Sequence, residues 1–182
     1  MPDYRVHGHS IVSDDDCITD ASGLMPEALR NDADWAHFQA ELDRAAVIVL
    51  GRKGHEQNPN PKRRPRLVVS SSARGIERRA DGWWWNPADV PLLQAIIRVA
   101  PQGGIVAVPG GRLVNDLFLE LGFDAYHLVR KRGVRLPGGV KIFTGVNEAG
   151  GAEALLARHG LTPAAPVVLD AAAAVSLTVW QR

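Results

Sequence analysis

The chain has 182 residues and a mass of 19.7 kDa, and 46% of its residues are hydrophobic, so it can bury one substantial core and is predicted to form a single domain, residues 1–182. A formal net charge of +1 gives it no electrostatic reason to bind nucleic acid or an anionic membrane. The single cysteine, Cys17, cannot form an internal disulfide, and no apolar stretch approaches the ~20 residues of a membrane span; both features favour a cytoplasmic protein.

The N-terminal residues predict a strand followed by a long loop. Residues Tyr4–Ser13 have strand character, and His7 and His9 share one face of that strand. No third ligand stands at a recognisable spacing, so we predict no metal site. Residues 14–30 form a loop rich in acids, glycine and proline. Its first three residues are consecutive aspartates, which we interpret as solvated.

A helix is predicted next, because Asn31 or Asp32 can cap its N-terminus. Asp34 lies in the first turn, where the helix dipole favours a carboxylate that can cap backbone donors. If Asp34 instead points into a cleft, partial desolvation would raise its pKa and let it bind a substrate and assist protonation. The residues alone leave both roles open. The apolar face of this helix carries Trp35, Phe38 and Leu42.

Two continuous apolar runs, residues 45–50 and 66–69, are typical of buried parallel strands. Both deliver glycines, hydroxyls or cations at their carboxyl ends, where open α/β sheets bind ligands. A phosphorylated cofactor would fit these residues, although each one singly also fits a solvated loop charge or a turn. The residues concerned are Gly51, Arg52, Lys53, Gly54, Ser70, Ser71 and Arg74.

The stretch from Gly103 to Asp116 is the most informative part of the chain. A β-branched run breaks at Pro109, Gly110 and Gly111 directly into a helical pattern. Two glycines let backbone N–H groups approach a ligand closely, and a helix N-terminus attracts a pyrophosphate. The stretch therefore has the form of a phosphate-binding turn.

The remaining elements alternate without internal repeats. The tryptophan run 83–85 is predicted to be a short strand with at least one ring exposed. A helix should begin within residues 86–89 and end before Pro101. Further predicted elements are a strand at 125–130, a helical segment at 153–159, and a closing antiparallel pair at 167–169 and 174–180.

Three of these segments, in this order, resemble the dihydrofolate reductase superfamily, including the reductase domain of the bacterial riboflavin-biosynthesis deaminase-reductase. They are VIVLGRKGHE (47–56), RLVVSSS (66–72) and VAVPGGRLVNDLF (106–118), and the resemblance runs from about Val6 to Phe143. It implies a three-layer α/β fold with a mostly parallel twisted sheet flanked by helices, and a C-terminal antiparallel strand pair.

The resemblance also implies NADPH as the cofactor and a cis peptide bond between Gly110 and Gly111. Gly54 stands where dihydrofolate reductases have a threonine, and Pro109 replaces the first of three glycines, which changes how phosphate hydrogen bonds are supplied. By position, Gly51, Arg52, Lys53 and Gly54 would contact the cofactor phosphates, Ser70, Ser71 and Arg74 the adenosine 2′-phosphate, and Val108, Pro109, Gly110, Gly111, Arg112 and Leu113 the pyrophosphate and nicotinamide side.

The segment MPEALRNDADWAHFQ (25–39) resembles the Met-Pro turn and following helix of dihydrofolate reductases. In that register Asp34 has the position of the substrate-binding carboxylate, which makes it the candidate catalytic residue. Arg64 aligns with the arginine that pairs with the folate glutamate, although it lies within the basic loop PKRRPR (61–66) and also fits a loop cation. The implied substrate-binding residues are Trp35, Phe38, Arg64 and Val114.

Other residues favour the riboflavin-type branch. Ser13, Asp15 and Ile18 match its Ser-x-Asp-Gly-x-Ile pattern, with Asp16 in place of the glycine. The segment 136–143 resembles the Gly-rich stretch that closes the riboflavin-type domain, and residue 114 is a valine where dihydrofolate reductases have a tyrosine. We narrowly favour reduction of an aminopyrimidine resembling 5-amino-6-ribosylaminouracil, with dihydrofolate as the runner-up.

Two further interpretations stay open. The chain could be a relative that binds NADPH without turnover, or an α/β scaffold whose glycines and serines only form turns. The predicted partner is a small-molecule substrate, with neither nucleic acid nor membrane, and the sequence leaves a homodimer open.

Overall fold

The structure, a computed structural model, describes residues 1–182 and contains a large and a small sheet. The large sheet has the order β10-β12-β8-β1-β7-β3-β4-β6-β5, with β11 paired to β12, and β2 and β9 form the small sheet. In chain order the strands are β1 (Tyr4–Val12), β2 (Cys17–Thr19), β3 (Val47–Gly51), β4 (Arg66–Val69), β5 (Ile76–Arg79), β6 (Gly82–Trp85), β7 (Gly104–Gly110), β8 (Ala125–Lys131), β9 (Val140–Lys141), β10 (Thr162–Pro163), β11 (Val167–Asp170) and β12 (Val175–Gln181).

The central strands of the large sheet, from β8 to β6 in this order, run parallel. Antiparallel pairs lie at its two edges, where β5 joins β6 and β12 joins β8, β10 and β11. Residues 47–50 of β3 are all buried, as expected for a strand covered on both faces. The pairing of β11 with β12 confirms the predicted C-terminal antiparallel pair.

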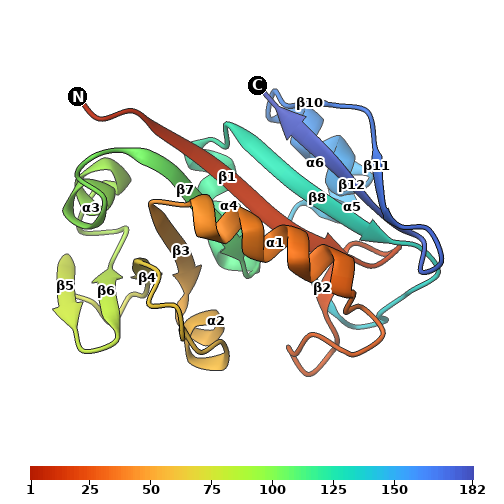
Figure 1. Cartoon of the computed structure of the whole chain (residues 1–182), viewed down its shortest axis with the longest axis horizontal. Coiled ribbons are helices and arrows are strands. Elements are labelled where there is room, and N and C mark those ends of the chain that lie inside the picture. Colours follow the sequence, from red (N-terminus) through yellow and green to blue (C-terminus); the bar gives the residue numbers. More distant parts are fainter.

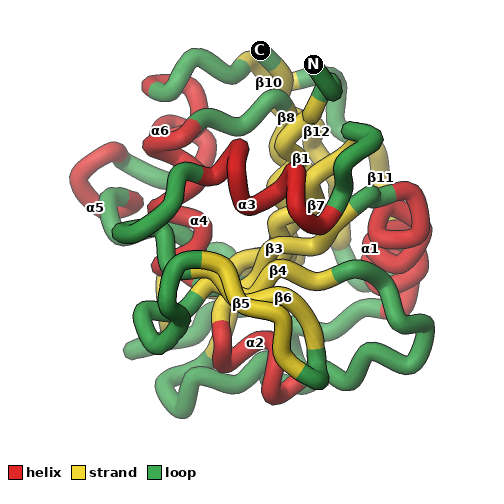
Figure 2. Tube along the Cα trace, turned by 90° about the vertical axis from the view of Figure 1, so that its left-hand side faces the viewer, coloured by secondary structure: helices red, strands yellow, loops and turns green.

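Helices cover both faces of the large sheet (Figures 1 and 2). One face carries α1 (Asp32–Arg44), and the other carries α3 (Leu92–Val99), α4 (Arg112–Leu121), α5 (Val146–Ala149) and α6 (Ala152–Arg158). The short α2 (Arg52–Gln57) follows β3 directly. This three-layer arrangement confirms the predicted fold class. None of the helices combines the length and the apolar character that crossing a membrane requires.

Side chains alternate along β1 and divide the interior into two layers. Val6 and Val12 belong to the larger core, which includes residues of α3, α4, α5 and α6. His9 points the other way, toward α1, and its ring centroid lies 5.9 Å from that of Phe38. At Gly8, a Cβ would lie 2.2 Å from the Tyr126 ring of the neighbouring β8, so the absent side chain makes room for this tyrosine.

The three aspartates that follow β1, residues 14–16, bind neighbouring segments of the chain. The expectation that they are solvated is therefore wrong. The carboxylates of Asp14 and Asp15 accept backbone N–H bonds of 2.8 and 3.0 Å from the segment before β9. Asp16 lies 2.6 Å from Arg130, which also contacts Glu153 at 2.6 Å. Asp16 has a φ of 61°, in the left-handed region. Its ion pair with Arg130 holds an aspartate in a conformation that favours glycine.

Three other local predictions are wrong. Trp35 does not pack into the core, because it is 57% exposed. The tryptophan run does not expose a ring either. Trp84 and Trp85 are buried in opposite layers, and Trp83 is half-buried. The reason is that β6 lies between β4 and β5 in the sheet. The helix expected to begin within residues 86–89 begins later, at Leu92, with Pro91 as its N-cap.

Candidate functional site

The carboxyl ends of β7, β3 and β4 meet at one edge of the large sheet. These three strands are parallel neighbours, and their register pairs Leu50 with Gly110 and Gly51 with Val69. Ser70 directly follows Val69. The turns that the sequence assigns to a phosphorylated cofactor therefore lie side by side, at the edge where α/β sheets bind ligands.

The turn after β7 depends on Gly110, which has a φ of 96°. A Cβ at this position would lie 2.9 Å from the side-chain nitrogen of Asn115, which donates a hydrogen bond to the carbonyl of Ile142 (3.1 Å). The Gly110–Gly111 peptide bond is trans, so the expected cis bond is wrong; the left-handed φ of Gly110 turns the chain from β7 into α4. Gly111 caps α4 without a side-chain hydrogen bond, which leaves the first N–H groups of this helix available to an anion.

The first turn of α4 has an exposed and a buried side. Arg112 and Leu113 face solvent, and Leu113 is 76% exposed. Val114 is buried, and its Cγ2 lies 3.3 Å from the point where a Cβ on Gly51 would stand. Gly51 therefore allows β3 to approach α4, and Val114 packs there without lining an open cleft. The last two predicted residues of this segment lie within β7: Val108, which is buried, and Pro109, which is half-buried.

The turn after β3 leads straight into α2. Gly51 is its N-cap and offers no side-chain hydrogen bond. Arg52 lies 2.8 Å from Glu56 one turn later, in an exposed pair. Lys53 is exposed and Gly54 is half-buried within the same turn. An incoming phosphate would compete with Glu56 for Arg52, whereas Lys53 forms no salt bridge.

The turn after β4 holds hydroxyls and one further cation. The Ser70 and Ser72 hydroxyl oxygens are 2.8 Å apart, and Ser70 Oγ also accepts the backbone N–H of Ser72. Ser71 and Arg74 are exposed, and the guanidinium of Arg74 forms no salt bridge. This turn therefore presents a free hydroxyl and a free guanidinium beside the glycine turns of β3 and β7.

Asp34 lies in the first turn of α1, where it is half-buried. The helix is capped by Asn31, whose Oδ1 accepts the backbone N–H groups of Ala33 and Asp34 at 3.0 Å each. Asp34 therefore is not needed as the cap. Burial raises the pKa of its carboxyl to about 6, and the carboxylate forms no salt bridge. A carboxyl with this pKa can hold or release a proton near neutral pH.

The other predicted substrate residues do not all gather around Asp34. Phe38 follows it by one helical turn on the same face and is half-buried, whereas Trp35 is exposed. Arg64 lies against the far end of α1, with Nη2 2.6 Å from Asp43. Asp43 is nine residues beyond Asp34, roughly 13 Å along the helix. The structure thus does not bring Arg64 to Asp34.

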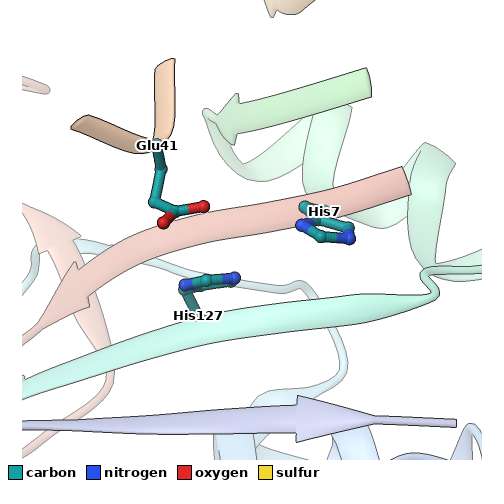
Figure 3. Close-up of side chains that lie close together, drawn as sticks. All are labelled: His7, Glu41 and His127. Atoms are coloured by element: carbon teal, nitrogen blue, oxygen red, sulfur yellow. The ribbon is translucent and has the colours of Figure 1, made fainter. Parts of the chain in front are cut away.

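A polar cluster beneath α1 was missed by sequence reasoning (Figure 3). His37 and Glu41 of α1 and His127 of β8 join His7 and His9 of β1. The spacing of His37 and Glu41, four residues apart on a helix, is a signal that places them on one face. The partner strand, however, could not be read from the sequence, because it depends on the pairing of β1 with β8.

Comparison with known proteins gives the fold. No protein-family model matches the chain, and no curated protein matches it by sequence. Among solved structures, it is similar to the Enterococcus faecalis dihydrofolate reductase complexed with NADP(H) and RAB-propyl (14% identity, 98% of this chain, 96% of that chain, TM-score 0.66). It is also similar to a Shewanella sp. PV-4 protein provisionally assigned to riboflavin biosynthesis (20% identity, 98% of both chains, TM-score 0.66).

The sheet order and the helices on both faces define a three-layer α/β protein with a mostly parallel sheet. Both solved structures match almost the whole chain. The protein therefore has the dihydrofolate-reductase-like fold.

Proposed function

We propose that the protein is an NADPH-dependent reductase that transfers hydride to a pyrimidine- or pterin-type substrate. One observation carries the proposal. At one sheet edge, the ends of β3, β4 and β7 bring together two helix N-termini without a side-chain cap and cations without a salt bridge, and a half-buried carboxyl with a raised pKa lies in the first turn of α1. The similar Enterococcus faecalis structure holds NADP(H), which supports this choice of cofactor.

The residues at the sheet edge fit a dinucleotide with an extra phosphate. The free N–H groups at the start of α4, next to Gly110, would hold the pyrophosphate. Lys53 and Arg74, which have no salt-bridge partner, would bind the remaining phosphates, with Ser71 beside Arg74. NADPH supplies the hydride when bound, and the protein supplies orientation, charge balance and exclusion of water.

Asp34 would contact the substrate and donate a proton to it. A pKa of about 6 keeps a fraction of Asp34 protonated near neutral pH, so this carboxyl can donate a proton to a reacting nitrogen. Phe38 on the same face would cover one side of a flat ring. Asp34 is thus the proposed catalytic residue.

The state of Arg64 favours an aminopyrimidine over dihydrofolate. Its guanidinium is already bonded to Asp43 and to Gln39 (2.9 Å), so a glutamate carboxylate would have to displace these partners. Val114 in place of a tyrosine and the Ser13-x-Asp15 opening support the same choice. Dihydrofolate remains the second candidate.

Cofactor binding is the first test. Calorimetry should show tighter binding of NADPH than of NADH, and Arg74→Ala should weaken NADPH about 10- to 100-fold while leaving NADH unchanged, because a charge-assisted hydrogen bond is worth ~1.5–3 kcal/mol. Arg98→Ala, an exposed arginine in the last turn of α3, is the matched control. Equal affinities for the two cofactors would exclude a 2′-phosphate site. If neither cofactor binds, the protein is an α/β scaffold whose glycines and serines only form turns.

Turnover is the second test. NADPH oxidation is followed with an aminopyrimidine nucleoside and with dihydrofolate at matched cofactor concentration. Asp34→Asn should lower kcat ~10²–10⁴-fold with little change in NADPH affinity. Dihydrofolate turnover with antifolate inhibition would overturn the substrate choice. Binding without any turnover would identify a non-catalytic relative.

A further inference from the structure

Polar side chains interrupt the apolar layer between α1 and the large sheet. Four of the six histidines in the chain gather there, although they come from three elements. The His127 ring centroid lies 4.5 Å from that of His9, 5.5 Å from that of His37 and 5.7 Å from that of His7. Glu41 completes the group from α1. Such a layer needs an explanation, because apolar side chains would pack there without loss of hydrogen bonds.

Several nitrogens of this layer have no partner within the protein. Nδ1 of His7 and both ring nitrogens of His9 are buried and form no hydrogen bond. Unpaired buried polar atoms destabilise a fold and are uncommon, so the free Nδ1 of His7 is available to a ligand, whereas His9 is not among the ligands proposed below.

We propose that His7, Glu41 and His127 bind one divalent transition-metal ion, with Zn²⁺ as the best match. One donor atom from each of these residues lies within 4.8 Å of the other two (Figure 3). Two imidazoles and one carboxylate are a donor set that Zn²⁺ accepts, and the same set with open positions also suits Fe²⁺. This site goes beyond the proposed reductase function and shares no residue with it.

The geometry needs only a small contraction to coordinate an ion. Tetrahedral bonds of ~2.0–2.1 Å place donor atoms ~3.4 Å apart, so no pair has to approach by more than about 1.4 Å. The neighbouring strands β1 and β8 fix the two histidines, and the longer side chain of Glu41 can make the adjustment. One Glu41 oxygen lies 3.2 Å from the exposed Arg44, which leaves the other oxygen for the ion.

His37 lies where it can orient His127, one of the proposed metal ligands. Its Nε2 lies 3.3 Å from Nδ1 of His127, so Nε2 of His127 remains for the metal. A hydrogen bond to the second ring nitrogen is the common support of a metal-bound histidine. His37 is therefore a positioning residue, and its loss should weaken the site without abolishing it.

The proposed ion would be accessible and separate from the sheet edge described above. His7, Glu41 and His127 line a cavity of about 610 Å³ near the amino ends of β1 and β8. Three protein ligands leave at least one coordination position, which faces this cavity and can take water or an anion. Glu41 lies seven residues beyond Asp34, roughly 10 Å along α1, so the two sites can be perturbed independently.

The test is metal titration of the untagged, chelator-treated protein. Competition with a chromophoric chelator should show one Zn²⁺ per chain, and Co²⁺ should give the visible absorption bands of a low-symmetry site. Glu41→Gln and His127→Gln should each lower Zn²⁺ affinity at least 100-fold, and His37→Gln about 10- to 100-fold. His159→Gln, which changes a histidine at the end of α6, should bind like the wild type.

Folding is controlled in the same samples. Zn²⁺ should raise the melting temperature of the wild type and of His159→Gln but not of Glu41→Gln, in which glutamine keeps the shape of the side chain. His7→Asn provides a second ligand variant if His127→Gln fails to fold. The proposal is overturned if the wild type binds no Zn²⁺ stoichiometrically, or if folded variants at Glu41 and at either histidine ligand bind it as tightly as the wild type.

Discussion

Replacing Asp34 with asparagine should make the protein more stable at neutral pH. Burial raises the pKa of this carboxyl from 3.8 to about 6. The folded state therefore holds the proton more tightly than the unfolded state. Stability is highest below the unfolded pKa, falls as the pH rises from 3.8 to about 6, and stays low above this window.

The size of the effect follows from the pKa difference. A shift of roughly two units corresponds to about 3 kcal/mol of folding free energy. Asparagine removes the charge at nearly constant shape, so Asp34→Asn should raise the unfolding free energy by about 3 kcal/mol at pH 7.5 and by about 1.5 kcal/mol at pH 5. A residue that destabilises the fold by this amount is typical of a functional site.

Urea denaturation of wild type and variant at pH 5, 6 and 7.5 measures this effect. The matched control is Asp32→Asn, which changes an exposed acid in the same first turn and should cost only a few tenths of a kcal/mol through the helix dipole. If Asp34→Asn is neutral at pH 7.5, or stabilises equally at pH 5, the carboxyl is not desolvated. Its proposed role as a proton donor would then lose its physical basis.

Three further substitutions test residues that stabilise the fold, and the same denaturation assay measures them. Asn31→Ala should cost at least about 1 kcal/mol by removing the cap of α1 and the hydrogen bond to Asp170, and Asn31→Ser should recover part of this by restoring the cap. Gly8→Ala should cost at least about 2 kcal/mol, since its Cβ would collide with Tyr126; an unchanged midpoint would show that the ring can move. Arg130→Ala should cost about 3–5 kcal/mol by leaving Asp16 buried without its partner, and a loss below 1 kcal/mol would contradict the anchoring role of this pair.

Local sequence patterns were enough to predict the central sheet. The apolar run at 66–69 coincides with β4, and the β-branched run that breaks at Pro109 ends two residues before the end of β7, because a strand covered on both faces needs a continuous apolar run. The run at 45–50 likewise predicts β3, and the cap at Asn31 places the start of α1. Hydrophobic period and capping act over a few residues, so the sequence carries them directly.

Errors arose where a residue's role depends on distant contacts. Nothing local indicates that Trp35 remains exposed or that Arg64 is held by Asp43. The six residues of α2 include a glycine and no apolar stripe, so their helical state depends on the end of β3 and not on propensity. The φ of Gly110 likewise replaces an expected cis bond.

The sequence by itself determined the fold class, the glycine turns at the strand ends and the shared face of His7 and His9. Only the tertiary structure decided that β8 lies beside β1 and that α1 covers both, which brings His127 and Glu41 to His7. The physical reason is that strand alternation and helix periodicity are encoded within a few residues, whereas the choice of neighbouring strand depends on burying both faces of the whole sheet at once.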